Sequence, residues 1–274
     1  MKWRAIKSGI NCAAYNMAVD EAILKAHAAG QVPPTLRLYG WQPAAVSIGY
    51  FQKAAGEVDL AECRRQGIDV VRRLTGGRAV LHAAELTYSL VVSEDHPLVP
   101  ATITASYRFF SQGLLDGLNR LGISAQMSMP KAAYGQTKRR HASAACFDAP
   151  SHYEVTFAGR KLVGSAQVRK EGVILQHGSI LLSFDSHKVA SLLNLPTAED
   201  KERVAAMLAM RAMSISEAGQ RNISWEEACD AMLTAFGPAL GIELDPGSLT
   251  DKEEAAASQL RIEKYTQDSW NLLR

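Results

Sequence analysis

Three strand-like segments follow one another almost without a break in the second half of the chain, and they constrain its fold more than any other feature. They read YEVTF (153–157), KLVGSAQVR (161–169) and VILQHGSILLSF (173–184), with the short turns AGR and KEG between them. Apolar and β-branched runs bounded by glycine-containing turns are typical of neighbouring strands joined by hairpins. The sequence therefore predicts a β-sheet that contains this run of strands.

Helical patterns lie on both sides of these strands. In residues 103–121 the apolar side chains recur at helical spacing, namely Ile103, Tyr107, Phe110, Leu114, Leu118 and Leu121. Further helices are expected at 13–29 and 57–66, and short strands at 35–40, 45–50 and 68–73. The chain is therefore predicted to be α+β, a mixed β-sheet with packed helices.

No linker-like change of composition interrupts the 274 residues, so a single principal domain is expected. We predict a catalytic body over residues 1–245 and a short helical C-terminal extension over residues 246–274 that packs on it. Thr250 and Glu253 form the Thr-x-x-Glu pattern of a helix N-terminus, which indicates where the extension becomes helical.

The composition argues against several classes of protein. Thirty basic residues against 28 acidic ones leave a net charge of +2, which is too balanced to select nucleic acid by bulk charge. No secretory signal and no membrane-spanning run is visible, and four scattered cysteines show neither disulfide nor metal-ligand spacing. We expect a cytoplasmic protein without a metal, whose basic segment 130–142 forms a mobile loop that meets acidic proteins rather than nucleic acid or a membrane.

The segment RRLTGGRAVLH, residues 72–82, combines two glycines with three arginines directly after a predicted strand. Consecutive glycines allow the backbone to approach a ligand closely, and Arg72, Arg73 or Arg78 could hold a carboxylate, a phosphate or a polarised carbonyl. The segment is neither of the usual nucleotide-binding motifs. A tight turn flanked by surface arginines is the structural alternative, and this segment alone does not decide between the two.

The segment KLVGSAQVRKEGVILQHGSILL, residues 161–182, places Gly164, Ser165 and Ala166 in the middle of a strand. Small residues at such positions often mark the close passage of a ligand or of another backbone. Lys161 begins the strand and His177 lies on the next one. Each has a structural alternative, an edge lysine in solvent for Lys161 and a hydrogen-bonded core histidine for His177.

The segment SAACFDAPSHYEV, residues 143–155, contains Cys146. A free cysteine is most often a small buried hydrophobe, and a reactive one needs a neighbouring cation that lowers its pKa from about 8.5. Lys161 and the pair His141 and His152 are the candidates nearby in the sequence. The residues alone leave open whether Cys146 is inert or a nucleophile.

Taken together, these segments resemble the biotin/lipoate protein ligase superfamily over most of the chain. RRLTGGRAVLH is similar to the Arg-Arg-x-Ser/Thr-Gly-Gly signature of lipoate ligases and octanoyltransferases. GRKLVGSAQVRKEGVILQHGSILL is similar to their lysine strand and the following Gln-His-Gly-x-Leu-Leu strand, and PPTLRLYGWQPAAVSIGYFQ to their N-terminal strands. The joint occurrence of three motifs in the family's order is specific, and it implies a biotin/lipoate ligase-like catalytic fold.

Within the superfamily, SAACFDAPSHYEV resembles the cysteine-dependent octanoyltransferases. The resemblance implies that Cys146 is the acyl-thioester nucleophile and that Lys161 lowers the pKa of its thiol. It also implies a set of substrate-binding residues, namely Arg73, Thr75, Gly76, Gly77, His82, Gly164, Ser165, Ala166 and His177.

The same resemblance implies that octanoyl passes from octanoyl-acyl carrier protein to a lysine of a lipoyl-domain protein such as the glycine-cleavage H protein, in endogenous lipoate assembly and without a cofactor. Two related activities stay open, an amidotransferase between lipoyl-carrying proteins and an ATP-dependent lipoate ligase. Arg78 and Ala83 stand where lipoate ligases have a third glycine and an aspartate, which counts against the ligase. A non-catalytic acyl-binding protein is disfavoured by the joint presence of Cys146 and Lys161.

Overall fold

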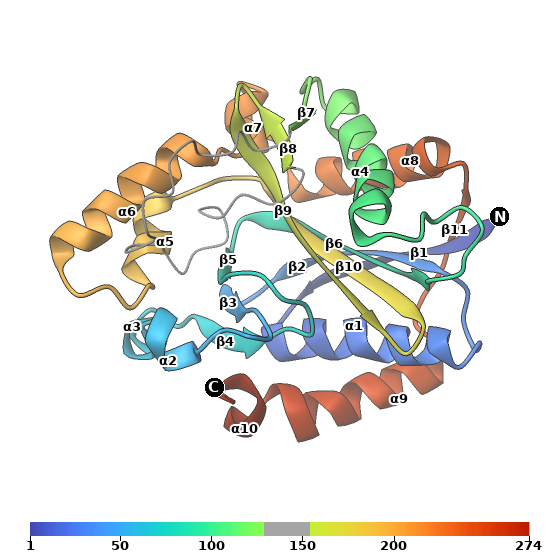
Figure 1. The fold of residues 1–274 in the computed structure, drawn as a ribbon, viewed down its shortest axis with the longest axis horizontal. Coiled ribbons are helices and arrows are strands. Elements are labelled where there is room, and N and C mark those ends of the chain that lie inside the picture. The colour runs from blue at the N-terminus through green and yellow to red at the C-terminus, as the bar shows by residue number, and fades with distance from the viewer. Residues whose placement is uncertain (129–153, 274) are drawn as a thin grey trace.

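The computed structural model describes residues 1–128 and 154–273 and is built around a mixed eight-stranded sheet (Figure 1). The strand order is β11-β1-β2-β6-β10-β9-β8-β7. Only β1 pairs in parallel, with β11 and β2, and the other neighbours are antiparallel. The strands are β1 (Lys2–Asn11), β2 (Thr35–Trp41), β6 (Glu85–Ser93), β7 (Gln126–Ser128), β8 (Glu154–Phe157), β9 (Arg160–Lys170), β10 (Val173–Leu181) and β11 (Glu243–Pro246).

A second, three-stranded sheet has the order β4-β3-β5. Its strands are β3 (Ala45–Ile48), β4 (Asp69–Arg72) and β5 (Val80–His82), and the short helices α2 (Ala54–Glu57) and α3 (Leu60–Arg65) lie beside it (Figure 1). β3 pairs in parallel with β4 and antiparallel with β5. The loop between β4 and β5 contains the two consecutive glycines of RRLTGGRAVLH.

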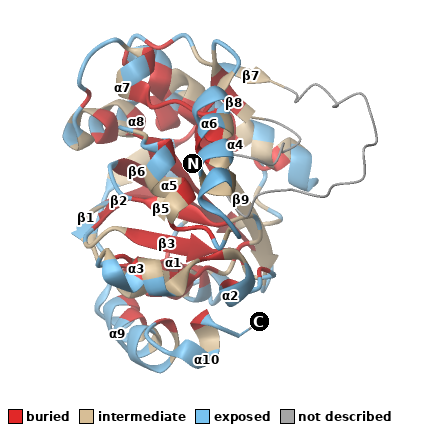
Figure 2. Ribbon diagram, turned by 90° about the vertical axis from the view of Figure 1, so that its left-hand side faces the viewer, coloured by how far each residue is buried: buried red, intermediate tan, exposed pale blue. Residues whose placement is uncertain are grey.

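Helices cover both faces of the large sheet. On one face α4 (Ile103–Arg120) and α8 (Trp225–Leu240) enclose the larger apolar core, and on the other face lie α1 (Ala13–Ala28) and, beyond it, α9 (Asp251–Leu260) (Figures 1 and 2). The remaining helical segments are α5 (Ser186–Ser191), α6 (Ala198–Arg211), α7 (Ile215–Ala218), a π-helical turn (Arg261–Tyr265) and α10 (Asp268–Asn271). None of the helices in the described part of the chain is long and apolar enough to cross a membrane.

This architecture confirms the predicted α+β class, and the three consecutive strands appear as β8, β9 and β10. The expected helix at 57–66 is instead two short helices, α2 and α3. The sequence analysis assigned no strand to residues 2–11, which form β1. Charged side chains interrupt the apolar pattern of β1, and Arg4 is nevertheless buried because Glu253 of α9 accepts two hydrogen bonds from it, at 2.6 and 2.8 Å.

The C-terminal residues are helical as expected, and Thr250 and Glu253 form a complete capping box at the start of α9. The predicted boundary between residues 245 and 246 falls inside β11, which pairs with β1. The division into a catalytic body and an extension therefore stays a prediction.

Helices α4 and α8 pack closely because two glycines of α4 face α8. A Cβ atom at Gly113 would lie 2.5 Å from the ring of Phe236, and one at Gly117 would lie 2.5 Å from the sulfur of Met232. Both of these α8 side chains are completely buried, so neither can move aside without disturbing the core.

We predict that Gly113→Ala lowers the free energy of unfolding by about 1–3 kcal/mol, since overpacking outweighs the gain in helix propensity of about 1 kcal/mol. Urea denaturation followed by circular dichroism measures the change. Gln112→Ala, on the exposed side of the same helix turn, is the matched control and should stay within about 0.5 kcal/mol of the wild type. Equal stabilities of the two variants would contradict the close packing of α4 on α8.

Candidate active site

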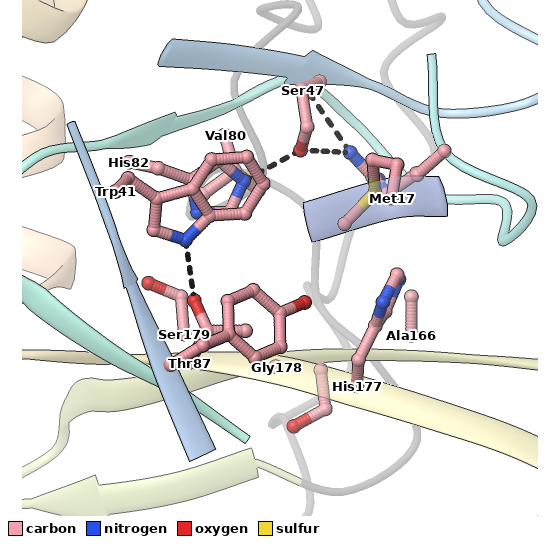
Figure 3. A pocket seen from close by; sticks show the side chains of 14 residues that line it. Met17, Trp41, Ser47, Val80, His82, Thr87, Ala166, His177, Gly178 and Ser179 are labelled. Atoms are coloured by element: carbon pink, nitrogen blue, oxygen red, sulfur yellow. Dashed lines mark hydrogen bonds between the residues drawn. The ribbon is translucent and has the colours of Figure 1, made fainter. Parts of the chain in front are cut away.

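A pocket lies between the face of the large sheet that carries α1 and the small sheet (Figure 3). The large sheet contributes side chains of β2, β6, β9 and β10, and the small sheet contributes side chains of β3 and β5. The lining residues are Met17, Tyr39, Trp41, Ser47, Arg73, Val80, His82, Thr87, Gly164, Ser165, Ala166, His177, Gly178 and Ser179. The sequence-predicted residues Arg73, His82, Gly164, Ser165, Ala166 and His177 thus meet in one place, although they come from segments far apart in the chain.

Small residues of β9 leave the space for this pocket. Across the strand pair, Gly164 is opposite Ser179 and Ala166 is opposite His177. Residues that face each other across an antiparallel pair point to the same side of the sheet. Larger side chains on β9 would therefore fill the space in front of β10, which supports the sequence argument from the mid-strand glycine and alanine.

Ser165 occupies a different position from the one expected. It borders the pocket, but its hydroxyl accepts a hydrogen bond of 2.7 Å from Tyr88, whose ring belongs to the core under α4 and α8. Successive residues of a strand point to opposite faces of the sheet. The side chain of Ser165 therefore lies on the face opposite to the one that Gly164 and the methyl group of Ala166 share. Ser165 supports the sheet beneath the pocket and does not present its hydroxyl to it.

Arg73 holds the loop that follows β4. Its Nε donates to Thr75 Oγ1 at 3.1 Å, Nη1 donates to the Ser47 carbonyl at 2.9 Å and to Ser47 Oγ at 3.0 Å, and Nη2 donates to the carbonyls of Gly76 and Arg78, both at 2.8 Å. A guanidinium has five N–H groups, and these contacts use all of them. The sequence suggested Arg73 as a donor to a ligand, whereas the structure shows its donors engaged with the protein.

One hydrogen-bonded chain runs from Arg73 into the large sheet. Thr75 Oγ1 lies 2.7 Å from His177 Nε2, and His177 Nδ1 lies 3.0 Å from Asp20 Oδ2 on α1. Arg37 Nη1 donates to the other oxygen of Asp20 at 2.8 Å. We call this series the Asp20 chain.

Electrostatics support a neutral imidazole beside a charged carboxylate in the Asp20 chain. Burial lowers the pKa of His177 below its usual value, although the hydrogen bond to Asp20 acts in the opposite direction. Burial raises the pKa of Asp20, but the hydrogen bond to His177 and the charge of Arg37 outweigh it, and the pKa of Asp20 is lowered overall. His177 is thus a hydrogen-bonded buried histidine, as the structural alternative held, and it also lines the pocket.

A second chain runs from Arg73 into the small sheet, and we call it the Glu85 chain. Ser47 Oγ lies 2.7 Å from His82 Nε2, and His82 Nδ1 lies 2.8 Å from Glu85 Oε1. The carboxylate of Glu85 also accepts hydrogen bonds from Thr87 Oγ1, at 2.5 Å, and from Ser179 Oγ. The imidazole of His82 stacks on Trp41, with ring centroids 4.0 Å apart and an interplanar angle of 13°.

The hydrogen bonds from Arg73 bear on which atoms donate and which accept in both chains. Ser47 Oγ and Thr75 Oγ1 each accept a hydrogen bond from Arg73 and lie 2.7 Å from a histidine Nε2, so each hydroxyl has its hydrogen available for that nitrogen. The Nδ1 of each histidine lies within hydrogen-bond distance of a carboxylate. The carboxylate beside each Nδ1 thus favours a hydrogen on that nitrogen in both imidazoles.

The glycine loop lies directly against β3. A Cβ atom at Gly49 would overlap the carbonyl oxygen of Gly77, so the chain after β3 needs a glycine at this position. Gly77 has a φ of +93°, and a Cβ there would lie 3.0 Å from Arg73 Nη2. Gly76 differs, because a Cβ there would meet only the ring of Phe51, at 3.8 Å. Of the two consecutive glycines, the second one is required by the backbone.

Arg72 joins the same loop to the C-terminal helices. Its guanidinium donates to the carbonyls of Gly49, Tyr50 and Gln52 at 2.9–3.0 Å, and to those of Trp270 and Asn271 at 3.1 Å. Asn271 Oδ1 accepts from the Arg72 amide at 2.9 Å. Arg72 is therefore buried as a structural residue and does not face the pocket.

Lys161 lies near the start of β9 and is only 5% exposed, which excludes the alternative of an edge lysine in solvent. Its Nζ lies 3.0 Å from Glu154 Oε1 of β8. Cys146, His141, His152 and the basic segment 130–142 lie outside the described residues, so the predicted pairing of Lys161 with Cys146 stays a prediction.

Several polar residues of this network were missed by the sequence analysis: Asp20, Ser47, Glu85, Thr87, Ser179 and Glu154. These residues stand in otherwise largely apolar helices and strands, and several of their partners are distant in the sequence, such as His177 for Asp20 and Ser179 for Glu85. Asp20 in the helical run and Glu85 three residues after His82 were visible as charges at core-like positions. Such charges are almost never buried unless they are paired, and that was the available signal.

Comparison with known proteins identifies the family. Residues 12–237 match the model of the lipoyl protein ligase A/B catalytic domain. The chain belongs to this family. Octanoyltransferase LipM of Brevibacillus brevis is 48% identical over 274 residues, covering 100% of this chain and 99% of that protein. Octanoyltransferase LipM of Bacillus subtilis is 42% identical over 273 residues, covering 99% and 98%.

Solved structures of family members show the same fold. A bipartite lipoate protein ligase from Thermoplasma acidophilum is 28% identical, with a TM-score of 0.82 and coverage of 100% of this chain and 98% of that one. A lipoate-protein ligase A bound with ATP is 27% identical, with a TM-score of 0.78 and coverage of 99% of each chain. The expected ligase-like catalytic fold is thus confirmed for this chain, and the chain is an enzyme of the acyltransferase class.

The two glycines of the loop give a matched test of its role in this acyltransferase. We predict that Gly77→Ala lowers the rate of acyl transfer at least about tenfold, because the side chain is strained at positive φ and presses on the guanidinium that orients the loop. Gly76→Ala should keep nearly the wild-type rate, since its Cβ has room. Rates of single-turnover acyl transfer measure both, and equal damage by the two substitutions would contradict the distinction.

Proposed function

We propose that this protein is an octanoyltransferase of lipoate synthesis that uses octanoyl-acyl carrier protein as donor and forms a thioester on Cys146. A lysine of a lipoyl-domain protein, such as the glycine-cleavage H protein, then takes the octanoyl group as an amide. Octanoyl transfer itself is the activity named for the full-length relatives. The donor, the covalent intermediate and the acceptor are the parts of the proposal that need an experiment.

The observation that carries the proposal is that the charged groups in and around the pocket are already hydrogen-bonded within the protein. Arg73 and Arg37 provide two positive charges, and Asp20 and Glu85 provide two negative ones, so the charges of these four groups cancel. Every N–H of Arg73 binds a protein acceptor, which leaves none of them for a free carboxylate. A pocket of this kind suits an uncharged acyl thioester, whose carbonyl group is already activated for acyl transfer.

An octyl chain also suits the apolar part of the lining. Met17, Val80, Ala166 and the faces of Tyr39 and Trp41 surround the space between the sheets. Burial of each methylene contributes about 0.8 kcal/mol, so the chain itself would supply much of the binding free energy.

The chemistry then takes two balanced steps. The Cys146 thiolate attacks the donor thioester, a new C–S bond forms, and the carrier leaves as a thiolate that takes up a proton. The neutral acceptor amine next attacks the enzyme thioester, a C–N bond forms as the C–S bond breaks, the nitrogen gives up one proton, and Cys146 leaves as a thiolate. Covalent catalysis of this kind lets two bulky protein partners bind in turn. Lys161 would favour the thiolate form of Cys146 in both steps.

Intact-protein mass spectrometry tests the proposal. With octanoyl-acyl carrier protein and without ATP or magnesium, the wild type should gain one octanoyl group that hydroxylamine removes, and Cys146→Ala should gain none. Burial raises the pKa of Cys63 to about 11 and that of Cys229 to about 12, so these thiols should not compete near neutral pH. Acylation only by free octanoate with ATP would establish a ligase, and acylation only by an octanoylated lipoyl protein would establish an amidotransferase.

A pH profile of iodoacetamide alkylation at Cys146 tests the role of Lys161. Removing a neighbouring ammonium raises the pKa of a thiol, so Lys161→Ala should move the alkylation profile about 1–3 units toward alkaline pH. Slow acylation by this variant should recover as the pH rises, and Lys161→Arg should restore it only in part. Lys170→Ala, at the other end of the same strand, is the control. Coincident profiles for wild type and Lys161→Ala would show that Lys161 acts elsewhere.

A further inference from the structure

The two hydroxyl–imidazole–carboxylate chains that start at Arg73 look alike but differ in charge and in access. In the Asp20 chain, the carboxylate pairs with Arg37 at 2.8 Å and also accepts from Tyr39 Oη at 3.0 Å. Its hydroxyl belongs to Thr75, which is completely buried and does not line the pocket. The charge of Asp20 is therefore compensated, and the hydroxyl is out of reach of a ligand.

The Glu85 chain has the opposite properties. Ser47 is itself only 1% exposed, but unlike Thr75 it lines the pocket together with His82, so its side chain borders the space in which an acyl group would lie (Figure 3). The side chain of Glu85 is only 1% exposed, and within residues 1–128 and 154–273 its one ion-pair partner is His82. A buried carboxylate without a cationic partner is costly, and a proton on the adjacent imidazole would compensate it.

We propose that Ser47, His82 and Glu85 form a proton relay that accepts the proton of the acceptor lysine in the second half-reaction. This inference rests on the proposed octanoyl transfer. Ser47 is the group that contacts the reacting nitrogen, and His82 and Glu85 act through it. The Asp20 chain, in contrast, has the structural role of positioning the glycine loop.

The step balances as follows. The acceptor lysine enters as a neutral amine, after loss of its first proton to water, and its nitrogen bonds to the thioester carbon. The nitrogen of the tetrahedral adduct gives a proton to Ser47 Oγ while the Ser47 hydroxyl proton moves to His82 Nε2. The C–S bond then breaks, the thiolate leaves, and the imidazolium releases its proton to water. No oxidant, metal or nucleotide takes part.

Some groups around His82 stabilise a positive charge on its imidazole ring, and others destabilise it. Glu85 at 2.8 Å and the stacked face of Trp41 at 4.0 Å stabilise a positive charge on the ring. Arg73, which shares Ser47 Oγ with the ring, opposes it, as does His177 once it is protonated. A relay has to return the proton in every turnover, and the imidazolium does so by releasing it to water.

Separate half-reactions test the relay. The octanoyl-enzyme is first formed with octanoyl-acyl carrier protein and isolated, and transfer to the lipoyl-domain acceptor is then followed in a single turnover. Glu85→Gln and Ser47→Ala should slow transfer to lysine about 100-fold, within the usual range for loss of a general base, and this loss should be much larger than their loss in formation of the octanoyl-enzyme. Ser47→Thr keeps a hydroxyl and should restore most of the transfer.

Hydroxylamine provides the control for a merely structural effect. This weakly basic amine cleaves thioesters with little need for a general base, so the Glu85→Gln and Ser47→Ala octanoyl-enzymes should lose far less rate toward it than toward lysine. Thr75→Val breaks the other chain and should slow lysine and hydroxylamine alike. Parallel losses toward both amines in Glu85→Gln and Ser47→Ala, or unchanged transfer to lysine, would overturn the relay. Failure of the wild type to form an octanoyl-enzyme would instead overturn the proposed function.

Discussion

The guanidinium of Arg73 is the interaction on which the arrangement of the pocket depends. It binds a carbonyl and a hydroxyl of Ser47 on β3, and it binds the loop after β4 through Thr75, Gly76 and Arg78. Arg73 thereby connects the small sheet to the glycine loop directly. It connects both to the large sheet through the hydrogen bond between Thr75 and His177. A charged group with five N–H donors in a fixed plane can connect that many acceptors, and a lysine could not.

Burying this cation requires that the rest of the network supply negative charge and acceptors. Asp20 and Glu85 do so from opposite sides, each through a histidine and a hydroxyl, and Arg37 compensates Asp20. The hydroxyls accept from one neighbour and donate to the next, so few hydrogen bonds are left unmade in a region that excludes water. Among the residues that the structure describes, Asp20 pairs with Arg37 whereas Glu85 pairs only with His82, and the proposed proton relay depends on this difference.

Much of the fold could be predicted from the sequence because the strands of residues 153–184 are joined by short turns and interact with near neighbours. β1 could not, since its pairing with β11 and the burial of Arg4 against Glu253 depend on residues about 240 positions away. The site shows the same limit. Arg73, His82, Ala166 and His177 belong to recognisable segments, whereas Ser47, Asp20 and Glu85 are single polar residues whose importance exists only in the folded protein. Even for Arg73, the sequence indicated the location and not the partners.

The contact between Arg72 and the segment Trp270–Asn271 has a consequence for biosynthesis. The Arg72 amide and the Asn271 side chain are separated by 199 residues, so a nascent chain exposes the glycine loop long before its last support leaves the ribosome. Until then the guanidinium of Arg72 lacks two of its five carbonyl partners, those of Trp270 and Asn271. The loop after β3 is then bound to Arg72 without the support of the C-terminal segment. The glycine loop thus gains its full set of contacts only after residues 270 and 271 have been synthesised.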